Sequence, residues 1–451
     1  MLLPYPHALV APSYFIHTFG CQMNESDSHR MGEALARAGW EPTPAAEQAD
    51  LVLVNTCAIR EKAEDKLYSA LGRYRLLKTQ RGTKIGVAGC VAQQEKERLL
   101  RRAPFVDFVL GPDHLDKVPE LVRKGGVETA FLETEQYLFP QADPESSRGN
   151  ATAFVTAMKG CDNVCSFCVV PYTRGREVSR PYAEIVREVA SLVAVGVREA
   201  TLIGQNVNAY AGGCDFAELI RRVAAVPGLL RIRFTTSHPM DLSEALVRCF
   251  REVPQLMPHF HLPVQHGADT VLQRMRRKYT IAEYERRIAA LPAEIALTSD
   301  IICGFPGETD DEHRQNLEFL RRTDYDNLFS FVYSPRPHTG AILKLEEWGE
   351  VPREIAIRRL EEVQSLQMAR TLKRHRDRVG DTVEVLVEES GFGRSRENWT
   401  VHFSGDAQPG DLVNVRVESA SLVALRGVQL GVTGSPRVDP PRKRRLSVVP
   451  A

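Results

Sequence analysis

The chain has 451 residues, which exceeds one ordinary domain and predicts two or three. Lys and Arg together number 58, as do Asp and Glu, so no net charge draws the whole molecule to nucleic acid and any RNA site must be a local patch. The nine cysteines are too few for a disulfide scaffold and no apolar run approaches the roughly 20 residues of a membrane span, so we expect a cytoplasmic protein with reduced thiols and no membrane partner.

The first part of the chain, over residues 14–126, alternates predicted strands with predicted helices. The strands are short apolar runs at 14–19, 51–55, 84–88 and 105–110, and helical stretches follow, such as 60–77 and 93–102. This alternation predicts a parallel α/β sheet with right-handed crossovers. Cys21, Cys57 and Cys90 come at the carboxyl ends of the first three strands, where open sheets bind ligands, so we expect these thiols to meet in space.

A polar, acidic segment over 127–150 contains two prolines and predicts a linker. The βα alternation resumes in a second domain over 147–378, with six predicted strands at 153–158, 199–203, 231–235, 259–262, 295–302 and 328–333. A helix that starts after Pro181 and stops at Gly196 joins the first two strands. Six such units predict a partial (β/α)6 barrel, in which the chemistry lies at the carboxyl ends of the strands. A charged helix over 352–378 follows.

After residue 379 the sequence pattern changes to short predicted strands with alternating apolar residues, such as 382–387 and 412–417. A turn at 409–411 separates them, and the pattern predicts a small β-barrel over 379–433. The tail over 434–451 carries a basic run at 442–445 and predicts a disordered end. Such a tail could add phosphate affinity, although a solvated tail without a role is the simpler interpretation.

Cys161, Cys165 and Cys168 form a tight triplet directly after the first strand of the predicted partial barrel. Thiolates at this spacing can bind three irons of a [4Fe–4S] cluster and leave the fourth iron open. Three thiolates are one too few for a closed zinc site, so the alternative is a zinc knuckle completed by a distant His or Cys. An open iron is a place where a small molecule can bind, which predicts chemistry rather than a structural role.

The tight triplet resembles that of the radical S-adenosylmethionine (SAM) superfamily. The resemblance implies that the open iron chelates the amino and carboxylate groups of SAM, and that one electron through the cluster cleaves SAM to a 5′-deoxyadenosyl radical. Motifs at the later strand ends fit the same superfamily, and a Gly304–Gly307 loop would allow close approach to an adenine ring. The cofactor contacts implied in this way are Gly204, Gln205, Asn206, Thr236 and Gln265.

Three arginines follow the tight triplet: Arg174, Arg176 and Arg180. They could help to bind SAM or a substrate phosphate, and Arg176 is the one that we assign to the cofactor. Ordinary surface arginines are the alternative. Cys214, Cys249 and Cys303 lie outside both triplets, and inert buried thiols are the simplest account of each.

The loose triplet of Cys21, Cys57 and Cys90 could be three buried structural cysteines, since free cysteine is commonly buried. The residues around it, such as Gly20-Cys21-Gln22-Met23-Asn24, resemble the amino-terminal domain of the methylthiotransferases, and the likeness extends from about residue 14 to 431. That resemblance implies a second [4Fe–4S] cluster with an open iron, which binds or supplies the inserted sulfur. His266 departs from the family pattern, which more often has a small hydroxyl residue there.

The last barrel, with the run Gly393 to Trp399, is similar to the TRAM RNA-binding domain. Arg394 and Arg396 could contact phosphate, and Trp399 could stack on a base or belong to the barrel core. Within the methylthiotransferases the motifs look like the tRNA branch, which implies methylthiolation of C2 of N6-isopentenyladenosine at position 37 of tRNA. Implied partners are the anticodon arm of tRNA, an electron donor such as flavodoxin or ferredoxin, and an iron–sulfur or sulfur donor protein.

Two alternatives to this function stay open on the sequence. One keeps the mechanism and changes the substrate to threonylcarbamoyl-modified adenosine or to an aspartate of a ribosomal protein. The other is a non-catalytic RNA-binding protein with structural zinc, which metal and sulfide analysis would distinguish.

Overall fold

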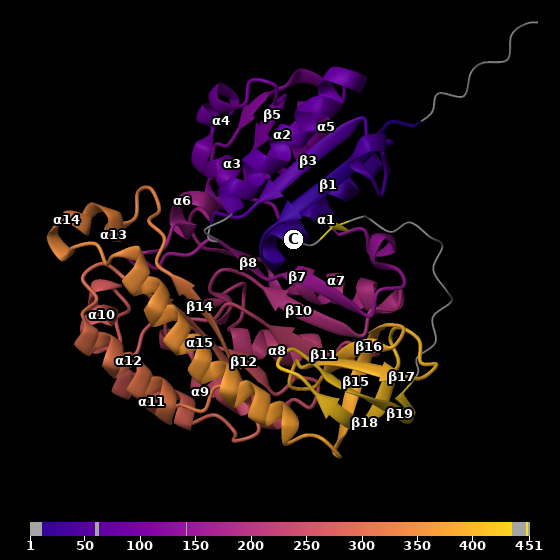
Figure 1. The fold of residues 1–451 in the computed structure, drawn as a ribbon. Coiled ribbons are helices and arrows are strands. Elements are labelled where there is room, and N and C mark those ends of the chain that lie inside the picture. The colour runs from indigo at the N-terminus through magenta and orange to yellow at the C-terminus, as the bar shows by residue number, and fades with distance from the viewer. Residues whose placement is uncertain (1–10, 59–62, 141, 435–447, 450–451) are drawn as a thin grey trace, which may run out of the picture. The chain divides into compact units, whose positions relative to one another are not determined.

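The computed structural model describes residues 11–58, 63–140, 142–434 and 448–449 (Figure 1). These residues divide into two compact units. The first contains the described chain up to Ser146, Tyr172–Gly175 and residues 448–449. The second contains Ser147–Pro171 and residues 176–434. In the part of the chain that the structure describes, no helix is long and apolar enough to cross a bilayer.

The first unit contains the parallel sheet that the sequence predicts, with strand order β2-β1-β3-β4-β5-β6 and β20 beside β1. Strand β3 is buried along its whole length because its apolar run is covered on both faces, as in other parallel sheets. The strands are β1 (Ser13–Phe19), β2 (Glu41–Pro42), β3 (Leu51–Thr56), β4 (Lys84–Gly89), β5 (Phe108–Leu110), β6 (Gly126–Glu128) and β20 (Val448–Val449).

The helices of the first unit are α1 (Gln22–Arg37), α2 (Ala63–Arg81), α3 (Cys90–Glu95), α4 (Glu97–Arg102) and α5 (Val118–Lys124). The helix expected over 93–102 is divided at Lys96, whose φ of 50° lies in the left-handed region. The strand expected from residue 105 begins only at Phe108, and β6 occupies the start of the expected linker because it pairs with β5. Residues 59–62, which include the start of the helix expected over 60–77, lie outside the described residues.

The second unit begins with six parallel strands in two sheets, ordered β11-β10-β7 and β12-β13-β14. A single bridge between Ile232 and Leu256 links β11 to the segment before β12, so the strands form the expected partial barrel. The strands are β7 (Thr152–Thr156), β10 (Glu199–Ile203), β11 (Arg231–Phe234), β12 (His259–His261), β13 (Ala296–Cys303) and β14 (Asn327–Val332).

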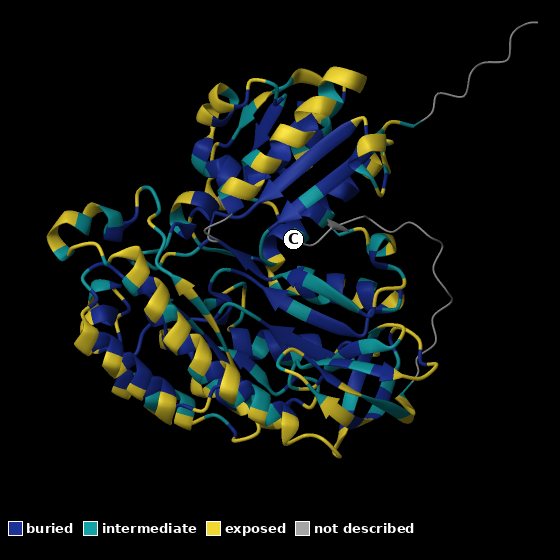
Figure 2. Ribbon diagram, viewed as in Figure 1, coloured by how far each residue is buried: buried dark blue, intermediate teal, exposed yellow. Residues whose placement is uncertain are grey.

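Helices between these strands bury apolar faces on the sheets and expose polar faces, as Figure 2 shows for α12. Two short antiparallel strands, β8 (Met158–Lys159) and β9 (Val178–Ser179), flank the tight triplet and α6 (Val170–Arg174). The longer helices are α7 (Tyr182–Ala194), α8 (Phe216–Ala224), α9 (Glu244–Glu252), α10 (Asp269–Arg274), α11 (Ile281–Ala289), α12 (Asp310–Arg322) and α15 (Arg353–Arg376); α13 (Gly340–Leu343) and α14 (Leu345–Trp348) are short.

The carboxyl-terminal strands close into the expected small barrel, with the order β15-β16-β17-β19-β18. Valines at alternate positions, such as Val383, Val385 and Val387, point into its core because successive residues of a strand face opposite sides. The strands are β15 (Thr382–Glu389), β16 (Phe392–Ser395), β17 (Thr400–Ser404), β18 (Leu412–Ala420) and β19 (Leu425–Gly434). Residues 435–447 and 450–451 of the expected disordered tail lie outside the described residues, whereas Val448–Val449 is the strand β20.

Two buried arginines of β11 hold this small barrel on the partial barrel. Arg231 Nη1 donates to the Arg394 carbonyl at 2.9 Å, and Arg231 also pairs with Glu384 at 2.9 Å. Arg233 Nη2 donates to the Ser395 carbonyl at 2.7 Å. Because both arginines bond to backbone carbonyls at the end of β16, they fix the position of the predicted RNA-binding run.

Candidate functional site

The loose triplet lies at the carboxyl ends of three adjacent strands. Cys21 follows β1 and precedes α1, Cys57 follows β3, and Cys90 is the first residue of α3 after β4. The Cys57 N–H donates to the Phe19 carbonyl at 2.9 Å, which joins two of these strand ends. Gly89, with φ 92°, precedes Cys90, and a Cβ there would lie 2.5 Å from the Thr56 carbonyl oxygen. The close approach of β3 and β4 beside the thiols therefore requires glycine.

Buried amides hold the first two cysteine-bearing segments together. Asn24 Nδ2 donates to Asn55 Oδ1 at 3.1 Å and to the Thr56 carbonyl at 3.2 Å. Asn55 Nδ2 donates in return to the Asn24 carbonyl at 2.8 Å and to Ser28 Oγ at 2.9 Å. Because these amides are buried and satisfy one another, the start of α1 is fixed against the end of β3.

Arg174 and Asp27 complete this site, and neither role could be read from the sequence pattern. Arg174 Nε donates to Cys90 Sγ at 3.2 Å, and Arg174 Nη2 donates to Asp27 Oδ2 at 2.6 Å. Arg174 is buried, so the alternative that it is an ordinary surface arginine is wrong. Hydrogen bonding with Cys57 lowers the pKa of the Cys21 thiol to about 6, while burial raises the pKa of Cys90. The thiolate form, which binds metal, is thus favoured at Cys21.

The tight triplet lies on one loop between β8 and α6. The Cys168 N–H donates to the Cys165 carbonyl at 3.1 Å, and Asn163 Nδ2 donates to Cys161 Sγ at 3.6 Å. Burial, followed by the charge of Cys165, raises the pKa of Cys168 to about 12. The thiols are therefore close enough to influence one another, and a bound metal would supply the positive charge that their ionisation needs.

A strained turn after α10 holds this loop. The Ser166 N–H donates to the Met275 carbonyl at 3.0 Å, and Ser166 Oγ donates to the Arg274 carbonyl at 2.7 Å. Arg276 and Lys278 have φ values of 57° and 43°, in the left-handed region that side chains disfavour, which costs of order 1–3 kcal/mol per residue. Such strain persists only where the surrounding contacts fix the backbone, so this turn is held firmly in its strained conformation.

The donor sets of both triplets fit iron–sulfur clusters. Each supplies three thiols, the ligand type of [4Fe–4S] clusters, and would leave one iron of a bound cluster without a protein ligand. Among the described residues, no group of three or more His, Cys, Asp or Glu is arranged to hold a single metal ion. The fit therefore rests on the chemistry and mutual proximity of the thiols.

The predicted SAM contacts at the second strand end cluster beside the tight triplet. Gln205 Oε1 accepts from the Gly160 N–H at 2.6 Å, and Asn206 Nδ2 donates to Asp241 at 2.9 Å. A Cβ at Gly204 would lie 2.5 Å from Met158 Cγ, so this position has no room for a side chain. The Asn206 Oδ1 atom is buried without a hydrogen-bond partner in the described part of the chain, which fits a polar ligand at this point.

The other predicted SAM contacts differ in their surroundings. Thr236 and Gln265 have φ values of 68° and 76°, so both strand ends carry strained backbone. Ser237 Oγ, on the residue after Thr236, is buried without a partner among the described residues. The Arg176 side chain is 82% exposed and pairs with Asp162 at 2.8 Å, so its assignment to the cofactor gains no support from burial.

Two family models match the chain at these sites. Residues 13–111, which include the loose triplet, match "Uncharacterized protein family UPF0004". Residues 155–320, which include the tight triplet, match "Radical SAM superfamily". Among curated proteins, "tRNA-2-methylthio-N(6)-dimethylallyladenosine synthase" of Myxococcus xanthus is 54% identical, covering 95% of this chain and 96% of the relative. The protein of the same name from Anaeromyxobacter sp. (strain K) is 56% identical over 94% of this chain and 96% of the relative. The chain belongs to this synthase family.

Solved structures show that the radical SAM fold extends to more distant proteins. The methyltransferase TsrM of Kitasatospora setae superposes with a TM-score of 0.54 at 14% identity, over 75% of each chain. The cobalamin-dependent radical enzyme OxsB superposes with a TM-score of 0.51 at 13% identity, over 79% of this chain and 56% of that one. At such low identity the likeness concerns the fold alone.

His266, which departs from the family pattern, supports the glycine loop after β13. His266 Nε2 lies 3.3 Å from Glu308 Oε1, and the Ala268 N–H donates to His266 Nδ1 at 3.0 Å. Glu308 in turn accepts from the Gly304 and Phe305 N–H groups. Although burial would raise the pKa of Glu308, hydrogen bonds from His266 and His313 lower it, so the carboxylate stays ionised and holds the loop.

The predicted RNA contacts lie on the small barrel. Arg394 Nε lies 3.4 Å from Glu388, and Arg396 Nη1 lies 3.8 Å from Glu384, so both charges are partly balanced at a half-exposed surface. Trp399 packs against the valine core, 5.9 Å from the His375 ring, with the Arg378 guanidinium 5.0 Å from its centroid. These contacts favour its core role, and base stacking stays a prediction for the exposed part of the ring.

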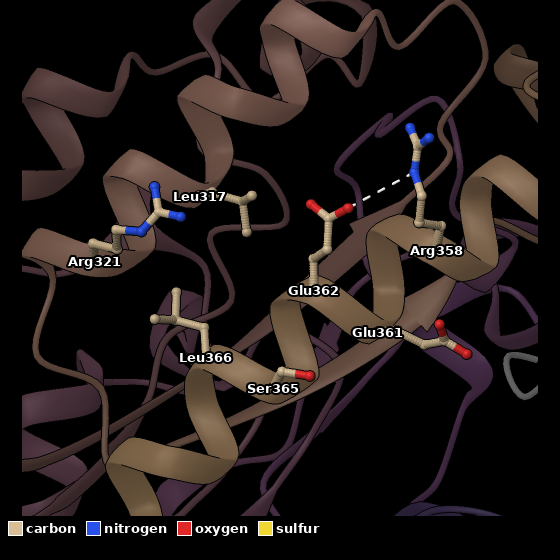
Figure 3. Close-up of a pocket in the computed structure, with 7 residues that line it drawn as sticks. All are labelled: Leu317, Arg321, Arg358, Glu361, Glu362, Ser365 and Leu366. Carbon is tan, nitrogen blue, oxygen red and sulfur yellow. Dashed lines mark ion pairs between the residues drawn. The ribbon is translucent and has the colours of Figure 1, made fainter.

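The remaining features lie away from the triplets. Cys249 and Cys303 are buried as expected, whereas Cys214 is partly exposed. Arg180 is buried and pairs with Glu188, so it is not a surface residue. A cavity of about 430 Å³ between α12 and α15 includes no cysteine in its lining (Figure 3). It is lined by Leu317, Arg321, Arg358, Glu361, Glu362, Ser365 and Leu366.

Proposed function

We propose that this protein adds a methylthio group to C2 of N6-isopentenyladenosine at position 37 of tRNA. The observation that carries the proposal is the pair of cysteine triplets in one chain, in a family whose members named above are tRNA-2-methylthio-N(6)-dimethylallyladenosine synthases. An aromatic C–H is unreactive to ordinary acid–base chemistry. The reaction therefore needs one site that forms a radical and another site that provides sulfur.

Cys161, Cys165 and Cys168 would hold the cluster that binds SAM, and Cys21, Cys57 and Cys90 would hold the cluster that handles sulfur. When bound, these groups supply one-electron reduction, a 5′-deoxyadenosyl radical and a carrier for the inserted sulfur. Gln205 and Asn206 would orient SAM, with Gly204, Thr236, Gln265 and Arg176 around it. The glycine loop braced by Glu308 would lie against the adenine ring.

Residues 14–126, 147–378 and 379–433 would act as the sulfur-site, radical and TRAM domains. The TRAM domain would bind the anticodon arm through Arg394, Arg396 and the exposed part of Trp399, and the target base would be splayed out to react. Arg231 and Arg233 would keep that binding surface in a fixed orientation to the barrel. We also propose an electron donor such as flavodoxin or ferredoxin, an iron–sulfur or sulfur donor protein, and a cytoplasmic location.

The test is mass spectrometry of nucleosides from isopentenylated tRNA after anaerobic incubation with the reconstituted protein, SAM and a strong reductant. We expect the 2-methylthio nucleoside, and we expect Cys161→Ala to abolish both this product and SAM cleavage. Cys249→Ala is the matched control, because Cys249 is a buried thiol outside both triplets. SAM cleavage without the product on this tRNA would redirect the search to threonylcarbamoyl-modified tRNA or a ribosomal protein.

A further inference from the structure

Arg277 touches the tight triplet from the turn after α10. Its side chain is buried, and Nη1 donates to Cys165 Sγ at 3.4 Å. The other nitrogens donate to Tyr279 Oη at 2.9 Å and to the Pro263 carbonyl at 2.8 Å. The guanidinium is therefore held by three hydrogen-bond partners, and of these three only Cys165, as a thiolate, would carry a negative charge.

Arg174 makes the corresponding contact at the loose triplet, with one difference. Its Nε lies 3.2 Å from Cys90 Sγ, but its charge is also paired with Asp27 at 2.6 Å. Arg277 forms no ion pair with a carboxylate in the described part of the chain. The tight triplet thus faces an unneutralised positive charge, while the charge beside the loose triplet is balanced.

The backbone around Arg277 is built to point the side chain inward. Arg276 and Lys278, on either side, both have left-handed φ values, and the Arg277 N–H donates to the Leu272 carbonyl at 2.9 Å. The same turn accepts the Ser166 N–H of the cysteine loop through the Met275 carbonyl. Strained residues at both flanks show that the position of this arginine is tightly determined.

We propose that Arg277 is a positioning residue that raises the reduction potential of the cluster held by Cys161, Cys165 and Cys168. A hydrogen bond and a buried positive charge at a ligating sulfur stabilise the form with the extra electron. The step is the gain of one electron from a low-potential electron-carrier protein, with no bond formed or broken and no proton transferred. The inference rests on the proposed assignment of this triplet to a [4Fe–4S] cluster.

The test is a redox titration, followed by electron paramagnetic resonance, of the full-length chain. The background carries Cys21→Ala, Cys57→Ala and Cys90→Ala, so that the signal comes from the tight triplet. We expect Arg277→Gln to lower the equilibrium constant for reduction at least tenfold, a downward shift of about 59 mV for a one-electron couple. Arg277→Lys should give a smaller shift, because lysine keeps the positive charge but cannot donate to all three partners in the same geometry.

Arg276→Gln is the matched control, since it removes the same charge from the adjacent, exposed side chain. If Arg277→Gln does not fold or load, Tyr279→Phe keeps the ring, removes the acceptor of Nε and should give a smaller downward shift. A loaded cluster whose potential is unchanged or raised in Arg277→Gln, or in Tyr279→Phe where that variant replaces it, would overturn the inference. So would an equal shift in Arg276→Gln. Absence of any iron–sulfur signal in the unsubstituted background would instead overturn the cluster assignment itself.

Discussion

The two cysteine triplets reach similar donor sets by different routes. The tight one is a single loop whose spacing is visible in the sequence, whereas the loose one is assembled from three strand ends of a parallel sheet. Each has a buried arginine on one sulfur, but Asp27 balances Arg174 and neutral atoms hold Arg277. Two sites with the same three cysteine ligands can therefore differ in electrostatic environment, because one buried arginine is paired with a carboxylate and the other is not.

The largest expected effect separates the two triplets by function. Cys57→Ala should abolish the methylthio product but leave cleavage of SAM measurable, because the tight triplet is intact. Cys165→Ala should abolish both. Chromatographic measurement of 5′-deoxyadenosine beside the nucleoside analysis checks this, and loss of SAM cleavage in a folded Cys57→Ala protein would contradict the division of roles.

The charge balance at the loose triplet is tested by Asp27→Asn. Removing one partner of a buried ion pair leaves Arg174 uncompensated, which typically costs about 3–5 kcal/mol of unfolding free energy. Asp162→Asn breaks the exposed pair with Arg176 and should cost at most about 1 kcal/mol. Chemical denaturation of both variants measures the difference. Equal losses of unfolding free energy would show that the buried pair contributes no more to stability than the exposed pair.

A pH effect is expected near Arg277. Burial, followed by the charge of Arg277, lowers the pKa of His238 to about 3, and its ring lies 5.9 Å from that of Tyr279. Because the folded pKa lies below the unfolded value near 6.5, stability is lost as pH falls below about 6.5. At pH 5 the loss from this group is about 2 kcal/mol.

Denaturation at pH 7 and pH 5 measures this loss. His238→Asn should remove it, because asparagine can still accept from the Met240 N–H that His238 Nδ1 binds. Arg277→Gln should make it smaller by raising the pKa of His238. An unchanged pH dependence in His238→Asn would contradict the assignment.

The smallest expected effect concerns an exposed charge at the tight triplet. Arg176→Gln should change unfolding free energy by at most about 1 kcal/mol, because its pair with Asp162 is exposed to solvent. If Arg176 also contacts SAM, the same variant should weaken SAM binding in calorimetry on the reconstituted protein. Unchanged binding would remove Arg176 from the proposed cofactor contacts.

The sequence predicted those parts of the fold that depend on local pattern. The apolar runs of β3, β4 and β10 and the alternating valines of β15 determine their own strands, and the strand ends place Cys21, Cys57 and Cys90 together. Lys96 was not predictable as a helix break, because nothing in its type favours a φ of 50°.

The parts that the sequence did not predict are contacts between distant segments. Arg277 reaches Cys165 and Arg174 reaches Cys90 only because the folded chain brings them together, and neither arginine stands in a pattern that marks it as buried. The sequence shows His266 only as a departure from the family pattern, because its partner Glu308 lies 42 residues further along the chain. Tertiary partners of single polar residues leave no periodic signal in one sequence.

The most direct test of the account is the count of iron and acid-labile sulfide per chain after anaerobic reconstitution. The account predicts two [4Fe–4S] clusters, so roughly eight irons and eight sulfides, and half of each when either triplet is replaced by alanine. Zinc without sulfide, or full iron content after loss of either triplet, would contradict it.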